Sequence, residues 1–120
     1  MLRTLVLGAS EKPDRYSNQA VLELRKHNHE VVAVGSMPGI IGDTNIQTAI
    51  EKNENVHTVT LYLNPDLQKQ YYDAIIRIQP KRIIFNPGTE NKELKELADK
   101  NGIKTLEACT LVLLRTDQYE

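Results

Sequence analysis

Several features that are common in proteins are scarce or absent in this sequence. Its 120 residues include a single cysteine and no tryptophan, and the formal net charge is only -1. One cysteine forms no internal disulfide bond, which is typical of a protein from the reducing cytoplasm. A net charge close to zero gives no broad positive field that would attract nucleic acid. We therefore expect a cytoplasmic protein that does not bind nucleic acid.

Long apolar runs and linker-like stretches are also missing. No apolar run approaches the roughly 18 residues of a membrane-spanning helix, so we expect no membrane association. The first residues lead directly into a strand pattern, with no sign of a signal peptide. A chain of this length with 40% hydrophobic and 26% charged residues allows one modest core. The sequence therefore predicts a single globular domain over residues 1–120.

Short apolar runs alternate with helical patterns along the chain. Strands are predicted at residues 2–7, 30–34, 56–63, 82–85 and 103–106. Helices are predicted from a cap at Ser17 to the segment 27–29, and at 45–52, 66–78 and 89–100, while 108–114 fits a short helix or a strand. This alternation predicts an α/β fold, a doubly wound, mainly parallel sheet of five or six strands between two layers of helices. Ligands of such sheets bind beyond the carboxyl ends of the strands.

The loop after the first strand, residues 8–16, carries the most informative chemistry. It is longer than the turn of a dinucleotide-binding fingerprint and holds one glycine where that fingerprint has three. Its backbone N–H groups, the hydroxyls of Ser10 and Ser17, and the cations Lys12 and Arg15 suit a phosphate group at the start of the first helix. The alternative is an ordinary connecting loop in which Ser17 only caps the helix.

The end of the second strand argues against a nicotinamide cofactor. NAD-binding sites place Asp or Glu there to hold the ribose hydroxyls, and NADP-binding sites have a nearby Arg. This chain has Val34-Gly35-Ser36-Met37-Pro38 instead. NAD(P)-type binding therefore stays only as an alternative, and a nucleotide held through backbone and hydroxyl groups is favoured.

The first loop also resembles a known motif. Gly8-Ala9-Ser10-Glu11-Lys12-Pro13, followed by Arg15-Tyr16-Ser17, is similar to the G-A-S-x-K-P…R-x-S stretch of the small CoA-binding proteins. These proteins resemble the amino-terminal CoA-binding domain of the succinyl-CoA synthetase alpha subunit. The similarity continues through Val31–Val34, Asn86-Pro87-Gly88 and Cys109, and so covers nearly the whole chain.

The resemblance implies a Rossmann-like domain that binds coenzyme A or an acyl-CoA, with the first loop holding the pyrophosphate. The chain departs from the family after the second strand, where relatives often have Pro-Asn-Pro. It departs again at Phe85-Asn86-Pro87, where many relatives carry Trp and Gln. The predicted cofactor-binding residues are Gly8, Ala9, Ser10, Lys12, Arg15, Ser17, Gly35, Ser36, Pro38, Asn64, Asn86, Gly88 and Cys109.

No catalytic set can be identified from residue spacing, and no metal site is predicted. His27, His29 and His57 are interpreted as structural, the first two because they lie at a predicted helix end. Cys109 is either a thiol that faces the ligand cleft or a small buried hydrophobe.

A CoA-binding protein without catalytic residues is the favoured interpretation. One alternative is an enzyme, or an enzyme subunit, acting on an acyl-CoA or nucleotide, with Asn64, Asn86 or Glu90 polarising a carbonyl. Another is a module that serves a synthetase-like partner chain. A homodimer through Tyr71 and Tyr72 is a further alternative, although these rings could equally pack against the sheet.

Overall fold

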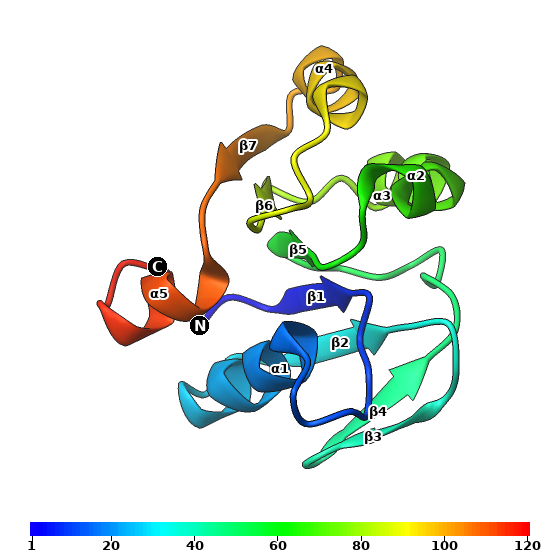
Figure 1. Cartoon of the computed structure of the whole chain (residues 1–120). Helices are drawn as coiled ribbons and strands as arrows, with labels where there is room; N and C mark the ends of the chain where they lie inside the picture. The colour runs from blue at the N-terminus through cyan, green and yellow to red at the C-terminus, as the bar shows by residue number, and fades with distance from the viewer.

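Seven strands form one sheet in the computed structural model, which describes all 120 residues. The strands are β1 (Thr4–Leu7), β2 (Val31–Val34), β3 (Gly39–Ile41), β4 (Thr44–Gln47), β5 (Thr58–Leu61), β6 (Arg82–Phe85) and β7 (Lys104–Glu107). Their order is β3-β4-β2-β1-β5-β6-β7, and every neighbouring pair is parallel except β3 and β4 (Figure 1). The doubly wound, mainly parallel sheet is thereby confirmed.

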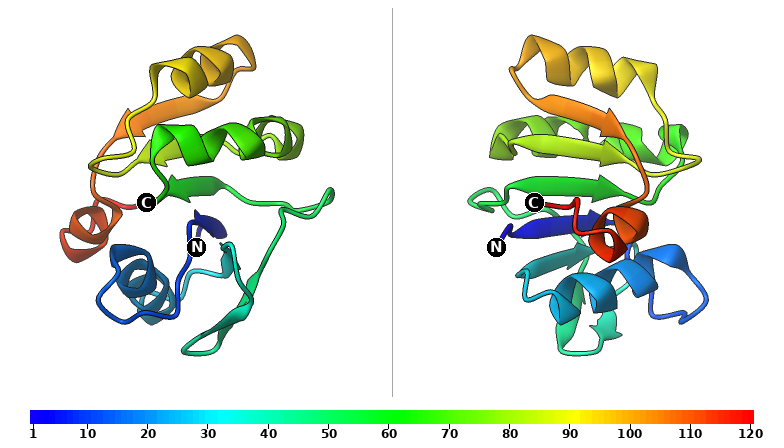
Figure 2. Two further views of the ribbon diagram at one scale, coloured as in Figure 1. Left: turned by 45° about the vertical axis from the view of Figure 1, so that its right-hand side comes forward. Right: turned by 90° about the vertical axis from the view of Figure 1, so that its left-hand side faces the viewer.

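Helices cover both faces of the sheet, as the two views of Figure 2 show. They are α1 (Tyr16–Lys26), α2 (Pro65–Gln68), the 3-10 turn η1 (Lys69–Tyr71), α3 (Tyr72–Ile78), α4 (Lys92–Lys100) and α5 (Thr110–Arg115). Helices α1 and α5 contact one another on one face, and α3 and α4 pack on the other. The predicted three-layer arrangement is therefore confirmed. None of the helices is long and apolar enough to cross a membrane.

The strand pleat divides the apolar residues between two cores. Successive side chains of a strand point to opposite faces. Leu5 and Leu7 of β1 accordingly join the core beneath α3 and α4, while Val6 joins the core beneath α1 and α5. Each core also receives a buried leucine from a helix, Leu94 of α4 in the first and Leu24 of α1 in the second. The central strands β1 and β5 are buried on both faces, and β5 includes two buried threonines, Thr58 and Thr60.

The sheet has two more strands than the minimum predicted, because one segment was wrongly predicted as a helix. Residues 45–52 do not form helical turns, since residues 45–47 belong to β4, which pairs with β3 as an antiparallel hairpin. Gly42, with φ +59°, and Asp43 form the two-residue connection between these strands. Glycine at the first position of such a loop is typical of a tight hairpin turn. The hairpin adds an antiparallel edge to the sheet beside β2.

Two helix predictions also need correction. The segment 66–78 is not one continuous helix but the succession of α2, η1 and α3. Helix α4 begins at Lys92 rather than near residue 89, because the side chain of Asn91 caps it. The ambiguous segment 108–114 is helical, as α5. All of these elements lie close to their predicted positions, so the topology is unaffected.

The chain leaves β1 in one direction toward β2 and later returns on its other side as β5. This reversal of strand order is where doubly wound proteins bind ligands, beyond the carboxyl ends of the strands. The loops that follow β1, β2, β5 and β6 therefore converge on one edge of the sheet.

The opposite, amino-terminal edge of the sheet holds both ends of the chain. The amino group of Met1 lies 2.9 Å from the side-chain carboxylate of Glu120. Tyr119 is buried, its hydroxyl contacts that of Thr4, and the Arg82 guanidinium lies 4.5 Å from the centre of its ring. These contacts fix the C-terminal segment across the start of β1.

Candidate functional site

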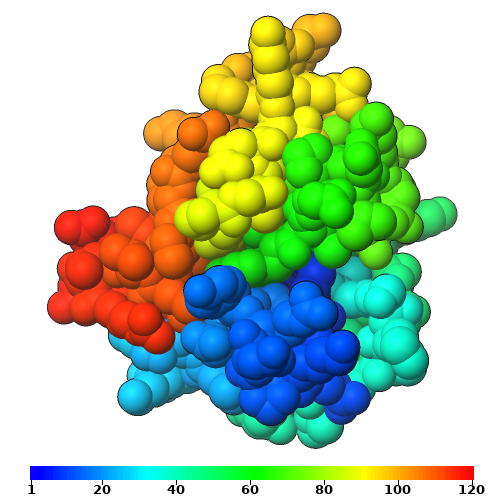
Figure 3. Space-filling view, in the orientation of Figure 1, coloured from blue at the N-terminus to red at the C-terminus, as the bar shows by residue number.

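A cleft of about 800 Å³ opens at the carboxyl edge of the sheet. Its walls come from the first loop and the start of α1 (residues 8–17), the segment after β2 (35–38), the segment after β5 (62–71) and the segment after β6 (87–89). Figure 3 shows the hollow between the blue first loop and the green segment after β5. Its volume falls within the roughly 300–1,000 Å³ of small-molecule pockets.

All of the predicted site residues line this cleft except Asn86 and Cys109. Asn86 is buried, and its Nδ2 atom donates to Thr60 Oγ1 at 2.6 Å and to the Leu61 carbonyl at 2.9 Å. Its Oδ1 atom accepts the Thr110 N–H at 2.9 Å. The amide thus joins β5, β6 and α5 beneath the cleft. Cys109 is half-buried and immediately precedes α5, outside the cleft lining.

The turn at the end of β1 depends on glycine. Gly8 has φ +98°, a conformation that side chains disfavour, and a Cβ atom there would come within 3.0 Å of the Leu63 side chain. The N–H groups of Gly8 and Ala9 both donate to the Val34 carbonyl, at 2.8 and 2.9 Å. These bonds hold the first loop against β2. They also mean that the Ala9 N–H, which we expected to face a ligand, is already occupied.

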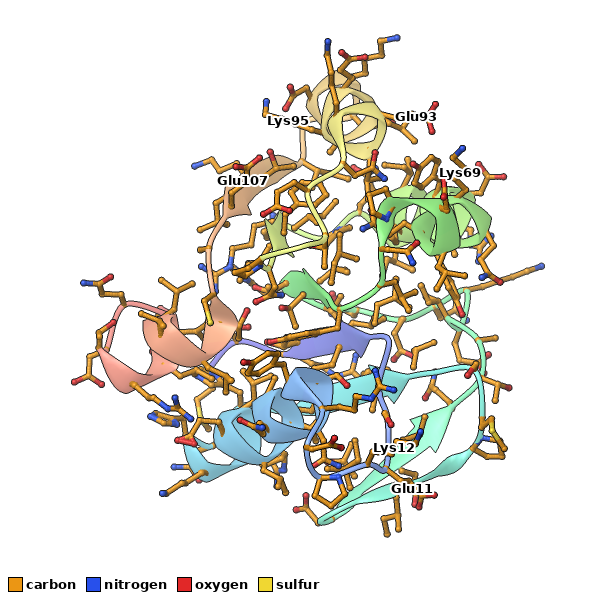
Figure 4. All side chains as sticks on the ribbon, in the orientation of Figure 1. Glu11, Lys12, Lys69, Glu93, Lys95 and Glu107 are labelled. Atoms are coloured by element: carbon orange, nitrogen blue, oxygen red, sulfur yellow. The ribbon has the colours of Figure 1, made fainter.

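Further along, the first loop presents unpaired donors. The N–H groups of Ser10 and Glu11 make no hydrogen bond within the chain. The Ser10 carbonyl accepts from Asn18 Nδ2 at 2.9 Å, which ties the loop to α1. Glu11 directs its carboxylate away to the hairpin, where Oε2 accepts the Ile40 N–H at 2.9 Å. Figure 4 shows Glu11 and Lys12 side by side on this loop, next to the hairpin.

Helix α1 begins in the cleft without a cap. Arg15 occupies the N-cap position with extended backbone, but its side chain makes no capping hydrogen bond. The first bond of the helical pattern runs from the Gln19 N–H to the Arg15 carbonyl, so the N–H groups of Tyr16, Ser17 and Asn18 are unsatisfied. The predicted cap, Ser17, is wrong: it is a buried residue of the first turn. The first turn also contains no acidic residue.

Charge is concentrated on one side of the cleft. Its only charged lining residues are Glu11, Lys12 and Arg15, all from the first loop. Neither cation makes an ion pair with another side chain, and Glu11 is engaged with the hairpin. The surroundings of the α1 start therefore favour an anion, because free N–H groups, the helix dipole and two unpaired cations converge there.

The rest of the cleft is uncharged. The segment after β2 approaches the first loop so closely that a Cβ atom on Gly35 would overlap the Ala9 carbonyl oxygen. On the other side of the first loop lies a surface that we call the uncharged wall. It consists of Tyr62, Leu63, Asn64, Leu67, Gln70, Tyr71, Pro87, Gly88 and Thr89. This wall combines apolar side chains with amide and hydroxyl groups.

Tyr62 is a lining residue that the sequence did not bring to attention. Its hydroxyl is buried and has no hydrogen-bond partner, and the nearby hydroxyls of Thr60 and Thr110 bond each other at 2.8 Å. Burial raises the pKa of the Tyr62 phenol well above its usual range. The phenol therefore stays protonated and cannot act as a base at neutral pH.

The histidines lie away from the cleft. His29 is buried, and its Nδ1 atom accepts the Leu2 N–H at 2.9 Å. The Nδ1 atom of His57 lies 2.8 Å from Thr58 Oγ1. Burial lowers the pKa of both imidazoles. No cluster of three or more potential metal-ligating side chains is present.

Tyr71 and Tyr72 pack against the sheet side of the molecule, the second of the two interpretations of these rings. Both are half-buried and pack against the core beneath α3 and α4. The Tyr72 hydroxyl accepts from Asn91 Nδ2 at 2.7 Å, and Tyr71 lines the cleft.

The sheet topology and its flanking helices define an α/β protein of the Rossmann-like class, with the cleft where such proteins bind their ligands. The family model described as CoA binding domain matches residues 3–115, and the chain belongs to this family. No curated protein matched the sequence.

Solved structures share the whole fold. The crystal structure of an uncharacterised protein is 43% identical, with a TM-score of 0.94 and 98% of each chain covered. A protein from Thermus thermophilus is 15% identical, with a TM-score of 0.85, over 98% of this chain and 90% of that one. A dinucleotide-forming acetyl-coenzyme A synthetase from Ca. Korarchaeum cryptofilum, solved with phosphate and ADP, is 17% identical with a TM-score of 0.67. The match covers 89% of this chain and 25% of the synthetase.

Proposed function

We propose that the cleft binds coenzyme A or an acyl-CoA, with the pyrophosphate at the start of α1. The observation that carries this proposal is the uncapped helix start. Three unsatisfied N–H groups, no acidic residue in the first turn, and the unpaired cations Lys12 and Arg15 all favour an anion at this point. The free N–H groups of Ser10 and Glu11 add donors from the loop. Membership of the CoA binding domain family supports the same ligand.

The distribution of charge supports coenzyme A over a ligand that is charged throughout. The cleft lining runs from Ile46 of β4 across β2, β1 and β5 to the loop after β6, five neighbouring strands and a width of about 19 Å at the usual strand spacing. A pyrophosphate on the first loop leaves the segment after β2 for the nucleoside. The same placement leaves the uncharged wall for the pantetheine arm. The two amide groups of this arm match the mixed apolar and hydrogen-bonding character of the wall. The segment 35–38 offers no acid for a ribose, so NADH should bind weakly or not at all.

Calorimetric titration with CoA tests this proposal. Wild-type protein should bind CoA and gain thermal stability, since a ligand at about ten times its dissociation constant stabilises the fold by roughly 1.4 kcal/mol. Lys12→Ala should weaken binding roughly tenfold, on the scale of one charge-assisted hydrogen bond. Lys69→Ala is the matched control, because Lys69 has the same charge but lies outside the cleft lining (Figure 4). Absence of both heat and thermal shift at millimolar CoA would overturn the proposal.

We also propose that the domain serves a synthetase-like partner chain. The supporting observation is that the Korarchaeum synthetase contains this fold as only 25% of its own chain. The cleft lining itself contains no histidine or cysteine that could act as a nucleophile. Affinity purification from cells, followed by mass spectrometry, should identify a chain with the remaining synthetase domains. Recovery of the domain alone, with CoA bound, would instead support a carrier role.

A further inference from the structure

A buried glutamine lies behind the uncharged wall of the cleft. Gln68, the last residue of α2, is fully buried although α2 lies at the surface. Its Nε2 atom donates to the Leu63 carbonyl at 2.8 Å and to the Thr89 carbonyl at 2.9 Å. Its Oε1 atom accepts from Asn91 Nδ2 at 2.8 Å. Every donor of this amide is thus used inside the protein, and its acceptor is engaged as well.

The two carbonyls belong to different loops of the same wall. Leu63 follows β5, Thr89 follows β6, and both residues line the cleft. The single Nε2 atom therefore holds the two loops at a fixed separation. A buried carbonyl that loses its donor carries a substantial cost, so the loops would shift if this amide were removed.

The network is anchored on its far side by α4. Asn91 caps α4 by accepting the Leu94 N–H at 3.2 Å, and its Nδ2 atom also donates to the Tyr72 hydroxyl at 2.7 Å. Through Asn91, Gln68 connects the wall to α3 and α4, which contribute no residue to the cleft lining. An apolar side chain could fill the same volume, so packing alone does not require an amide at this position.

We propose that Gln68 is a positioning residue that shapes the subsite for the pantetheine arm of CoA. The inference rests on the proposed CoA function and adds a specific consequence to it. The α1 start, which would hold the phosphates, makes no hydrogen bond with Gln68 or its partners. Loss of the amide should therefore weaken ligands that carry the arm and spare ligands that end at the phosphates.

The experiment compares CoA with ADP in variants of Gln68. Gln68→Met keeps the length of the side chain and removes both donors, and Gln68→Glu replaces the donor atom with an oxygen that would face two carbonyls. Gln79→Glu is the matched control, because Gln79 Nε2 also donates to a backbone carbonyl, that of Ile76 at 2.8 Å, but lies outside the cleft lining. Calorimetry is performed well below the melting temperature of each variant.

The Gln68 variants should bind CoA at least tenfold more weakly than wild type, a change on the scale of one lost hydrogen bond. Their affinity for ADP should stay within about twofold of the wild-type value. The control should retain both affinities. Equal losses for CoA and ADP, or no loss for CoA, would overturn the inference and leave the proposed function standing. Failure of the wild type to bind CoA at all would instead overturn the proposed function, and the inference with it.

A measurement on the wild type decides the matter if both Gln68 variants fail to fold. The side-chain amide of Gln68 gives NMR signals that are sensitive to the geometry of its two hydrogen bonds. These signals should move when CoA is added and stay in place when ADP is added. Unchanged signals at saturating CoA would show that the pantetheine arm does not contact the uncharged wall, and would overturn the inference.

Discussion

Helices α1 and α4 both begin at the carboxyl edge of the sheet, yet their first turns are built in opposite ways. Asn91 caps α4, Glu93 provides an acid in its first turn, and the cap is itself fixed by Gln68 and Tyr72. Helix α1 starts at Arg15 with no side-chain cap and no acid. The α4 start is thus satisfied within the protein, whereas the α1 start keeps the free N–H groups that our proposal assigns to an anion.

This difference has an energetic side. A good cap stabilises a helix by about 1 kcal/mol, so the free protein gives up stability at α1 that it retains at α4. An anion bound at the α1 start would restore that stability, because it satisfies the same N–H groups and the same helix dipole. Variants that remove the cap of α4 or add a cap to α1 therefore test the comparison from both directions.

Removing the cap of α4 should have the largest effect on the free energy of unfolding. Asn91→Ala removes the cap and also leaves Gln68 Oε1 and the Tyr72 hydroxyl without their donor. We expect a loss of roughly 2–3 kcal/mol in the free energy of unfolding, the sum of a cap and one unsatisfied buried group, Gln68 Oε1, since the half-buried Tyr72 side chain is open to water. Urea unfolding followed by circular dichroism measures this loss. Asn101→Ala is the control, since Asn101 bonds the Leu97 carbonyl at the exposed far end of α4 and should cost much less.

Adding a cap to α1 should have a smaller effect on the free energy of unfolding, and of the opposite sign. Arg15→Asn places the same residue type at the α1 cap that α2 and α4 already use, in backbone that is already extended. The free protein should gain about 1 kcal/mol in stability. CoA should bind at least several-fold more weakly, because one cation is lost and one N–H group is now occupied. Arg77→Asn, at the exposed end of α3, should leave CoA affinity unchanged, and stronger CoA binding by Arg15→Asn would contradict the comparison.

Mild acid should have the smallest effect and should not distinguish the two helices. Burial lowers the pKa of His29, with further lowering by the N-terminal amino group, His27 and Arg82, and with opposition from Glu120. A histidine whose pKa is lower in the folded state stabilises the fold fully above about pH 6.5, its unfolded pKa, and less as the pH falls toward the folded value.

His57 behaves in the same way, because burial, Arg82 and Lys81 all lower its pKa. The free energy of unfolding should therefore decrease between pH 7 and pH 5.5, by similar amounts in wild type, Asn91→Ala and Arg15→Asn. Urea unfolding at both pH values measures the change. His29→Asn, which keeps a hydrogen-bond acceptor but no titrating group, should show a smaller decrease, and an unchanged decrease would assign the effect to other residues.

The sequence was sufficient to predict the parallel core and the first loop, because both depend on local signals. Buried strands are short apolar runs bounded by turn residues, and the loop after β1 has a distinctive combination of glycine, hydroxyls and cations. The hairpin of β3 and β4 was missed because β4 contains no apolar run, and because Ile46, Ala49 and Ile50 have the spacing of a helix.

The site was harder to predict, because a residue's position in the chain does not fix where its side chain points. Asn86 and Cys109 follow strands at the correct edge of the sheet, yet Asn86 is turned beneath the cleft and Cys109 lies outside its lining. Gln68 reads as a surface residue of an amphipathic helix, and only the fold shows that it is fully buried between two loops. Tyr62 likewise follows a strand, and its place in the cleft wall became visible only in the structure.

The contact between Met1 and Glu120 provides attachment points that are far from the cleft. Both residues lie at the amino-terminal edge of the sheet, with the cleft at the carboxyl edge, so a tether at either residue would leave the ligand entrance free (Figure 1). The same proximity permits a circular permutant, in which a short linker joins the two ends and new ends are opened in an exposed loop. New ends between Lys52 and Asn55 would lie beside Arg3, near the present ends and before the start of β5, and would also leave the cleft free.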